Sequence, residues 1–510
     1  MLAWPIYISF LGAVLLLLLP RDNACAARWV ALAVALAGFG CGLAGTLHAQ
    51  SGTTHTITKL AWIRSLGIEY HLAADGISLT LVLLTGLAAI AGILFSWNIE
   101  HRAKEFFAFY LALIGGVYGV FLSFDLFLLF VFYEIAIIPK YFLIAIWGST
   151  RREYGAMKLA LYSFAGSAMV LIGLISAFVL AGAKTMSLPE LAKFPFPHDF
   201  QLWAFPLVFI GFGILAGLWP FHTWAPTGHV AAPTAASMLL AGVVMKLGAY
   251  GCLRVAMTVF PEGLQPWGFT FLGLGSWRDV FGLLAVVGIV YGAMVALVQK
   301  DFKFVIGYSS VSHMGFVLLG LMTLNRIGLS GAVLQMFSHG IIAGLLFAVV
   351  GRMVYERAHT RELSELQPLN LSRVIPFAAV TFTLASVASM GLPGFSGFVA
   401  ELQVLIGAWQ NYPTLTVVTG IGILVGVAYT LRALQKAFFA EHADADVAQA
   451  VPDHAALTCP RISIPEKAGA VLLLATSLLI GLCPGLLLNR IGASFDSPLF
   501  EGLRRVCGLP

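Results

Sequence analysis

The stretch Leu218-Trp-Pro-Phe-His-Thr-Trp-Ala-Pro-Thr-Gly-His229 decides the fold, because it places Pro220 and Pro226 inside an otherwise largely apolar segment. Proline removes a helix donor and clashes with the preceding turn, so a helix is expected to break here. A second segment, Met390-Gly-Leu-Pro-Gly-Phe-Ser-Gly397, is interrupted in the same way around Pro393. In a bilayer, freed backbone groups persist only where protein or a wet cavity covers them. The two breaks therefore indicate a transporter built from inverted repeats, with simple tolerance of Gly and Pro in packed helices as the alternative.

The composition requires a membrane around this chain. Of its 510 residues, 59% are hydrophobic and 10% are charged, and the mean hydropathy is +0.91. A soluble protein of this length cannot bury so much apolar surface in its cores. The apolar runs have the length of helices, roughly 20 residues, and lack the alternation of barrel strands. We expect an all-α polytopic membrane protein. The formal charge of +5 is too diffuse to indicate binding of nucleic acid.

About fourteen transmembrane helices are expected, and helices four to eight and nine to thirteen form two inverted five-helix repeats, each with one broken helix. We expect N-terminal helices in residues 1–103, a first repeat in 104–258, a second in 279–438, and a cytoplasmic loop with a C-terminal helix in 439–510. The predicted helices are 3–19, 28–47, 75–97, 104–124, 125–147, 157–182, 203–221, 231–258, 279–299, 302–323, 328–351, 373–410, 413–438 and 467–488.

Loop charges predict the orientation. Lys and Arg residues between the helices concentrate on one side, which places the N-terminus outside the cytoplasm. The acidic stretch from Glu441 to Asp453 then becomes a cytoplasmic loop. The first apolar run lacks preceding basic residues and a small-residue cleavage site, so we expect a retained helix rather than a signal peptide.

The cysteines give no sign of a metal site. None of the six forms a C-x-x-C pair or a metal-ligand spacing, which argues against an iron–sulfur cluster or structural zinc in this chain. The cysteines are Cys25, Cys41, Cys252, Cys459, Cys483 and Cys507.

Five ionisable residues lie inside predicted helices, most of them near mid-depth, namely Glu134, Lys246, His313, His339 and, after the second break, Glu401. Each costs about 2.5–3.5 kcal/mol or more to insert if it is charged and unpaired, so chance placement is disfavoured. Carboxylates, amines and imidazoles take and release protons once burial shifts their pKa values. A row at this depth predicts proton transfer parallel to the membrane. For the histidines, hydrogen-bonded packing is the alternative.

Three further charged residues are expected to have structural roles. Asp301 and Lys303 stand at the start of a predicted helix, where they suit a helix cap and an interfacial anchor. Arg254 is expected to extend its side chain to the membrane surface.

Four strings resemble the M subunit of bacterial NADH:quinone oxidoreductase (respiratory complex I), which corresponds to mitochondrial ND subunit four and is related to Mrp-type antiporters. The resemblance extends from about Asp75 to Phe438, and Glu401 in the second broken helix favours the M type over its L and N siblings. The strings are FYEIAIIPKYFLIAIWGS around Glu134, PFHTWAPTGHVAAPTA around His222, LLAGVVMKLGAYG around Lys246, and DFKFVIGYSSVSHMGF around His313 with a later FSHG.

The resemblance implies a role for each residue. It assigns Glu134 to an input half-channel, Lys246 and His313 to a central axis, and Glu401 to the exit. It also implies a translocase subunit of the bacterial inner membrane, with no catalytic chemistry and no cofactor of its own. NADH, FMN, iron–sulfur clusters and quinone are then expected in partner subunits, beside sibling antiporter-like subunits.

Three positions depart from the family pattern. Leu215 replaces a lysine that would pair with the glutamate at Glu134, Thr227 replaces an aspartate, and Lys140 stands where the family carries an apolar residue. Lys140 follows Glu134 by six residues, about 240° around a regular helix, so the two face each other only if Pro139 distorts the turn.

Several functions stay open at this stage. Lys140 could compensate for the missing lysine in a working proton channel, or the chain could be a variant complex I subunit with impaired pumping. A Mrp-type sodium/proton antiporter and a hydrogenase-linked membrane subunit are alternatives of a different class.

Overall fold

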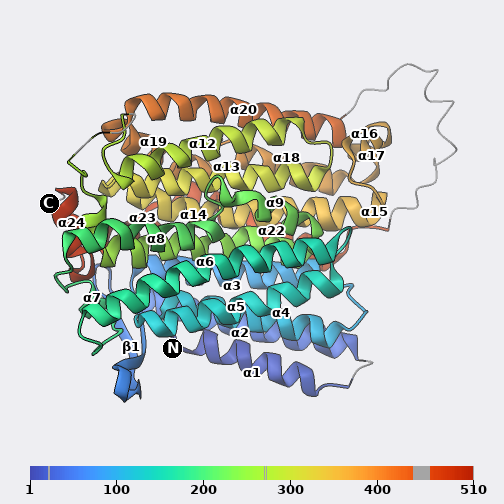
Figure 1. Cartoon of the computed structure of the whole chain (residues 1–510). Coiled ribbons are helices and arrows are strands. Elements are labelled where there is room, and N and C mark those ends of the chain that lie inside the picture. Colours follow the sequence, from blue (N-terminus) through green and yellow to red (C-terminus); the bar gives the residue numbers. More distant parts are fainter. Residues whose placement is uncertain (21–22, 269, 271–272, 440–459, 509–510) are drawn as a thin grey trace.

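The structure is a computed structural model that describes residues 1–20, 23–268, 270, 273–439 and 460–508. Long helices run nearly parallel to one another and form a bundle (Figure 1). The predicted acidic loop from Glu441 to Asp453 lies outside the described residues.

The described residues confirm the predicted number of membrane crossings. Twelve helical segments are long and apolar enough to cross a bilayer. The shorter apolar helix α1 and the pair α18 and α19 add two crossings, which gives fourteen. The bounds of the principal helices are α1 (Trp4–Leu18), α2 (Ala24–His48), α3 (Gly76–Phe95), α4 (Ala103–Leu122), α5 (Leu126–Trp147), α6 (Arg152–Leu180), α8 (His198–Ala216), α9 (Trp224–Ala231), α10 (Thr234–Leu239), α11 (Met245–Gly251), α12 (Trp277–Val298), α13 (Phe302–Met322), α14 (Arg326–Ala348), α18 (Pro376–Ser389), α19 (Ser396–Asn411), α20 (Pro413–Phe438) and α22 (Ile464–Leu482). Shorter helices are α7 (Leu188–Leu191), α15 (Glu356–Ala358), α16 (Leu363–Leu366), α17 (Leu371–Val374), α23 (Gly485–Ser494) and α24 (Glu501–Cys507).

Both predicted helix breaks are present. The first separates α8 from α9 and begins at Gly217, whose φ of +85° favours glycine. Pro220 lies within this break, whereas Pro226 lies in the first turn of α9, where the missing N–H costs no helical bond. The second separates α18 from α19, contains Pro393, and has Gly394 at a φ of +104°. The segment predicted as one helix over 373–410 is therefore two helices.

Two π-helical segments flank α11. Leu240–Val244 precedes it and Cys252–Met257 follows it, so residues 234–257 form one continuous span with two wider turns. π-Turns are rare and occur frequently at functional sites. The sequence analysis did not predict them.

A β-hairpin departs from the all-α expectation. Strand β1 (His55–Ile63) pairs antiparallel with β2 (Ile68–Ala74), with Lys59 opposite His71. Gly67 has a φ of +60° in the turn between them. The hairpin projects from one end of the bundle, beside α7 (Figure 1).

Candidate functional site

Lys246 is fully buried at the centre of the bundle. It lies on α11, donates a hydrogen bond to the carbonyl of Ala241 in the preceding π-segment, and places Nζ 2.9 Å from Nδ1 of His339 on α14. Two positive charges at this separation repel by about 6 kcal/mol at an effective dielectric constant of 20. Protonation of both groups at once is therefore disfavoured.

His339 continues the contact to His313 on α13. The two imidazole rings stack with centroids 5.3 Å apart and planes inclined by 27°. His313 Nδ1 lies 3.0 Å from Oε1 of Glu401 on α19, which makes an ion pair when the imidazole is protonated. Lys246, His339, His313 and Glu401 thus form one contiguous row across four helices.

Polar side chains surround the end of this row. Gln335 donates to Glu401 Oε1 over 3.2 Å, and the Ser389 hydroxyl lies 3.2 Å from His313 Nε2. A cavity of about 10 Å³ lies between these groups, at the lower limit of space for one water molecule. The cavity is lined by His313, Gln335, Ser338, His339, Ser389, Gly397 and Glu401 and by two apolar residues, Ile342 and Ala388.

Glu134 lies apart from this row, on α5. Its Oε1 is buried and has no hydrogen-bond partner among the described residues, and Ser167 of α6 lies beside the carboxyl group. Lys140 is also buried, donates to Ser163 Oγ over 3.3 Å, and is close enough to Glu134 for their charges to interact. Their charges interact across the six-residue spacing, but among the described residues no ion pair or hydrogen bond joins this pair. In the described part of the chain, no hydrogen bond connects it to Lys246.

The first break places two histidines inside the protein. His222 is buried and its ring packs edge-on against Tyr291, with centroids 5.2 Å apart. His229 is fully buried near Lys246 and Lys303, close enough for electrostatic interaction with both. Neither ring has a hydrogen-bond partner in the described residues. His229 was missed as a candidate, although its spacing of two helical turns from His222 was a visible signal.

Two of the three positions that depart from the family pattern, Leu215 and Thr227, lie on the helices that flank the first break. Leu215 is buried in α8. The Thr227 hydroxyl accepts a hydrogen bond from Lys158 Nζ over 3.4 Å and donates to the Thr223 carbonyl. Lys158, on α6, was not singled out from the sequence.

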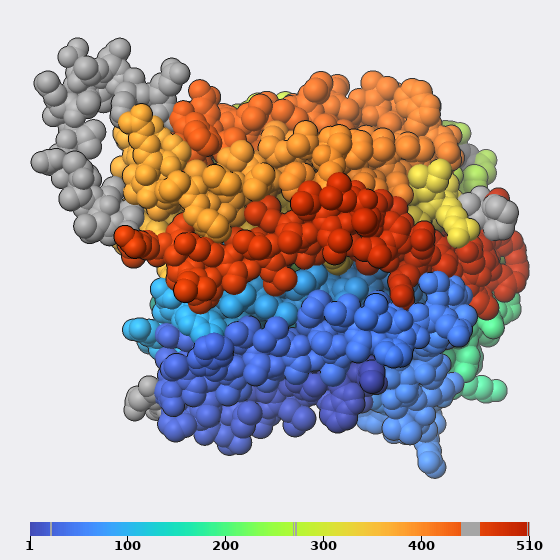
Figure 2. All heavy atoms as spheres, turned by 180° about the vertical axis from the view of Figure 1, so that it is seen from behind, coloured from blue at the N-terminus to red at the C-terminus, as the bar shows by residue number. Residues whose placement is uncertain are grey.

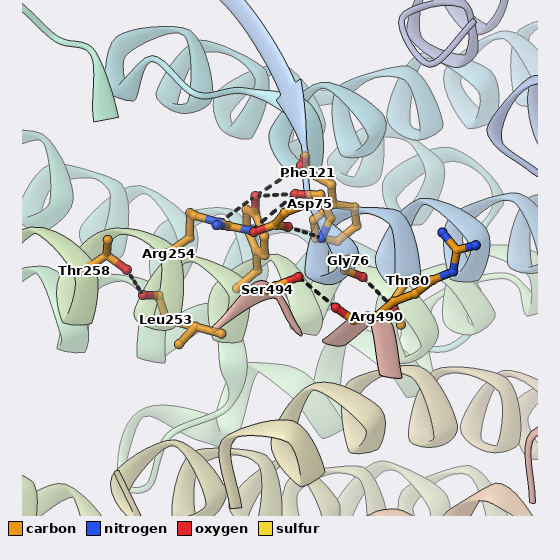
Figure 3. A network of polar contacts seen from close by, with 11 residues as sticks. Asp75, Gly76, Thr80, Phe121, Leu253, Arg254, Thr258, Arg490 and Ser494 are labelled. Carbon is orange, nitrogen blue, oxygen red and sulfur yellow. Dashed lines mark hydrogen bonds and ion pairs between the residues drawn. The ribbon is translucent and has the colours of Figure 1, made fainter. Parts of the chain in front are cut away.

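The expectation for Arg254 was wrong. Its side chain is fully buried and bonds Asp75 Oδ1 over 2.7 Å at the start of α3 (Figure 3). The guanidinium also lies 5.2–5.4 Å from the ring centroids of Phe124, Tyr250 and Phe500. The carboxylate partner and the aromatic faces offset part of the cost of burying this charge.

The expectation for Lys303 was also wrong, whereas that for Asp301 is confirmed. The Asp301 carboxylate accepts from the N–H groups of Lys303 and Phe304 and caps α13. Lys303 points inward instead of toward the interface, and its buried Nζ donates to the Ala232 carbonyl over 3.1 Å. That carbonyl follows the end of α9, where backbone acceptors lack a helical partner, and it also accepts from the Ser237 hydroxyl over 3.1 Å.

The described residues contain no group of three or more His, Cys, Asp or Glu side chains arranged to hold a metal ion. The members of the row, an amine, two imidazoles and a carboxylate, are proton donors and acceptors.

Comparison with known proteins decides the family. A family model described as NADH:quinone oxidoreductase/Mrp antiporter matches residues 123–426. The NADH-quinone oxidoreductase subunit M of Rhodobacter capsulatus is 36% identical over 484 residues, which cover 92% of this chain and 89% of that protein. The chain belongs to this family of antiporter-like membrane subunits. An NAD(P)H-quinone oxidoreductase chain 4 of Synechococcus sp. (strain JA-2-3B'a(2-13)) is also 36% identical, over 90% of this chain and 85% of that protein.

Solved structures of the family share the fold. A chain of respiratory complex I from Thermus thermophilus superposes with a TM-score of 0.85 at 27% identity, over 98% of this chain and 100% of that one. A chain of the Mrp complex from Dietzia sp. DQ12-45-1b gives a TM-score of 0.82 at 20% identity, over 100% and 99% of the two chains, and shows the fold alone. The predicted multi-pass, antiporter-like architecture is confirmed.

Proposed function

We propose that this antiporter-like subunit translocates protons as the M-type subunit of an NADH:quinone oxidoreductase in a bacterial inner membrane. The observation that carries the proposal is the contiguous row from Lys246 through His339 and His313 to Glu401. Every member of this row can hold a proton, and apolar helices surround it. Redox chemistry with NADH, FMN, iron–sulfur clusters and quinone belongs to partner subunits in this proposal.

Proton transfer along the row needs only short movements. The Lys246 ammonium donates to Nδ1 of His339 at 2.9 Å, which leaves a neutral amine and an imidazolium. His339 then passes a proton toward His313, and the water-sized cavity beside both rings provides space for a bridging molecule. His313 Nδ1 donates to the Glu401 carboxylate at 3.0 Å, which leaves a carboxylic acid on the exit side. Each step moves one proton and breaks no other bond.

Glu134 and Lys140 form the input end in this proposal. Lys140 supplies the charge that Leu215 cannot, because its buried ammonium group is close enough to Glu134 for their charges to interact. The N-terminus faces the periplasm, and residues 104–258 and 279–438 form the two inverted repeats. The break at Gly217 and the break at Gly394, one in each of these regions, support the division.

The substitution Lys140→Met tests this assignment. In the intact complex reconstituted in vesicles, we expect NADH oxidation and assembly to persist while proton pumping through this subunit is lost. Lys140→Arg keeps the positive charge and is the matched control, with pumping retained. Unchanged pumping in Lys140→Met would exclude Lys140 as the compensating charge.

The absence of the family lysine at Leu215 favours one alternative, a variant subunit that no longer pumps. Under that alternative, Glu134→Gln leaves the proton-to-electron ratio of the complex unchanged, whereas our proposal predicts a fall.

Mass spectrometry of the gently extracted complex separates the remaining alternatives. Flavoprotein and iron–sulfur subunits that co-purify with NADH:quinone activity support the proposal. Small antiporter subunits without a redox partner support a Mrp-type exchanger, and hydrogenase subunits support a hydrogenase-linked complex.

A further inference from the structure

Helix α22 packs on the bundle but lies beyond the part of the chain that the family model matches. It spans Ile464–Leu482, whereas the family model ends at residue 426. In the rear view the red C-terminal segment that contains it crosses the face between the orange and blue parts of the chain (Figure 2). The helix packs against α3, α14 and α19. It is therefore placed to influence the second broken helix.

The cytoplasmic end of α22 is fixed by a buried ion cluster. Glu466 accepts hydrogen bonds from Arg352 over 2.6 Å and from Arg357 over 2.8 Å, both on the helical segment that continues α14. Glu466 also forms a capping box with Ser463 at the start of α22. These contacts set the position of α22 along its axis relative to α14.

The other end of α22 lies directly on the second break. A Cβ atom added to Gly481 would lie 2.2 Å from the Gly394 carbonyl oxygen and 2.4 Å from the Phe395 carbonyl carbon. Such contacts with backbone are too short for any side chain, so only glycine permits this approach. Backbone freed by a break must be shielded from lipid, and α22 provides that cover.

A row of serine hydroxyls joins this contact to the proton path. Ser477 Oγ of α22 lies 3.0 Å from Ser396 Oγ, at the first residue of α19, and Ser396 Oγ lies 2.7 Å from Ser338 Oγ of α14. All three side chains are buried. Ser338 precedes His339 in the chain and lines the cavity shared by His313 and Glu401.

The break itself contacts the Glu401 carboxylate. A Cβ atom added to Gly391 would lie 3.2 Å from Glu401 Oε2, so the carboxylate rests against the loop between α18 and α19. A shift of this loop or of the first turn of α19 therefore moves Glu401 relative to His313.

We propose that Ser477 and Gly481 of α22 are positioning residues for the exit half of the proton path. They hold Ser396 and the second break in place, and thereby fix Glu401 at 3.0 Å from His313. The inference rests on the proposed function, because positioning matters only if Glu401 carries protons.

The test uses Ser477→Ala in the intact complex, reconstituted in vesicles and driven by NADH. We expect NADH oxidation to persist and proton pumping through this subunit to fall about fivefold, the factor that corresponds to one lost hydrogen bond of about 1 kcal/mol. Ser477→Thr restores the hydroxyl and is expected to restore pumping. Thr476→Val is the matched control, because the Thr476 hydroxyl bonds only the Leu472 carbonyl of its own helix within the described residues.

Further variants keep the outcome decisive. Ser396→Ala removes the middle of the hydroxyl row and is expected to reproduce the defect, and Gly481→Ala is expected to exceed it. Gly485→Ala, whose Cβ would meet Asn489 at an ordinary 3.5 Å, is expected to be silent. Normal pumping in Ser477→Ala, beside a loss in Glu401→Gln, would overturn the positioning role alone. Normal pumping in both would overturn the proposed function and this inference with it.

Discussion

Replacement of Arg254 by Met is expected to destabilise the protein by about 3 kcal/mol, near the lower end of the 3–5 kcal/mol that removal of one partner costs in a buried ion pair. The Arg254–Asp75 pair is 2.7 Å long, and the two side chains are 0% and 1% exposed. We expect the lower end of this energy range because the pair is incompletely hydrogen-bonded. One oxygen of Asp75 and one nitrogen of Arg254 have no hydrogen-bond partner among the described residues. The unpaired Asp75 carboxylate that remains in Arg254→Met accounts for most of the loss.

Equilibrium unfolding in mixed detergent micelles measures this loss, and a surface pair provides the control. Arg326 and Asp496 are 2.8 Å apart but 55% and 47% exposed, so Arg326→Met is expected to cost at most about 1 kcal/mol. The double variant Asp75→Asn/Arg254→Met is expected to recover most of the stability, because asparagine still caps α3. Equal, small losses in Arg254→Met and Arg326→Met would refute the argument from burial.

Two further predictions concern α5 and α11. Burial raises the pKa of Asp125, which precedes α5, from 3.8 to about 6, although three backbone N–H groups lower it. Its contribution to stability is therefore present at low pH and is lost as the pH rises through about 6. Unfolding at pH 5 and pH 7 should show this loss in the wild type, and a loss of equal size in Asp125→Asn would contradict it. Gly248→Leu places Cβ 2.4 Å from the Ala216 nitrogen and should cost at least 1–3 kcal/mol in the same unfolding assay, whereas wild-type stability would show that α8 can move away.

The helix count and the two breaks followed from the sequence because both depend on local chemistry. Apolar runs long enough to cross a bilayer define the spans, and Pro and Gly clusters interrupt them wherever the surrounding chain lies. The π-turns beside Lys246 were not predictable, because every residue in both segments is buried and a single wider turn leaves no distinct hydrophobic period. The hairpin at 55–74 was missed because neither strand alternates cleanly: β1 has no buried residue, whereas the last four residues of β2 are all buried.

The sequence predicted which ionisable side chains lie inside the bundle, but it did not predict most of the residues that they contact. Lys246, His313, His339 and Glu401 were recognised because ionisable groups are rare inside membrane helices. Their contacts join helices far apart in the chain, and so Gln335 and Ser389 were recognised only from the structure. The partner of Arg254 was missed for the same reason, since Asp75 lies 179 residues away. For Lys140, helical geometry argued against a pair that faces across α5, and the structure gives it Ser163 of α6 as its hydrogen-bond partner and an electrostatic interaction with Glu134.

The number of protons translocated per NADH oxidised, measured in a complex that carries His339→Gln, tests proton transfer along the row from Lys246 to Glu401. Glutamine can still accept a hydrogen bond from Lys246, yet it cannot carry a proton between Lys246 and His313. We predict a ratio below that of the wild type, with NADH oxidation and assembly retained. A wild-type ratio would contradict proton transfer along the row from Lys246 to Glu401.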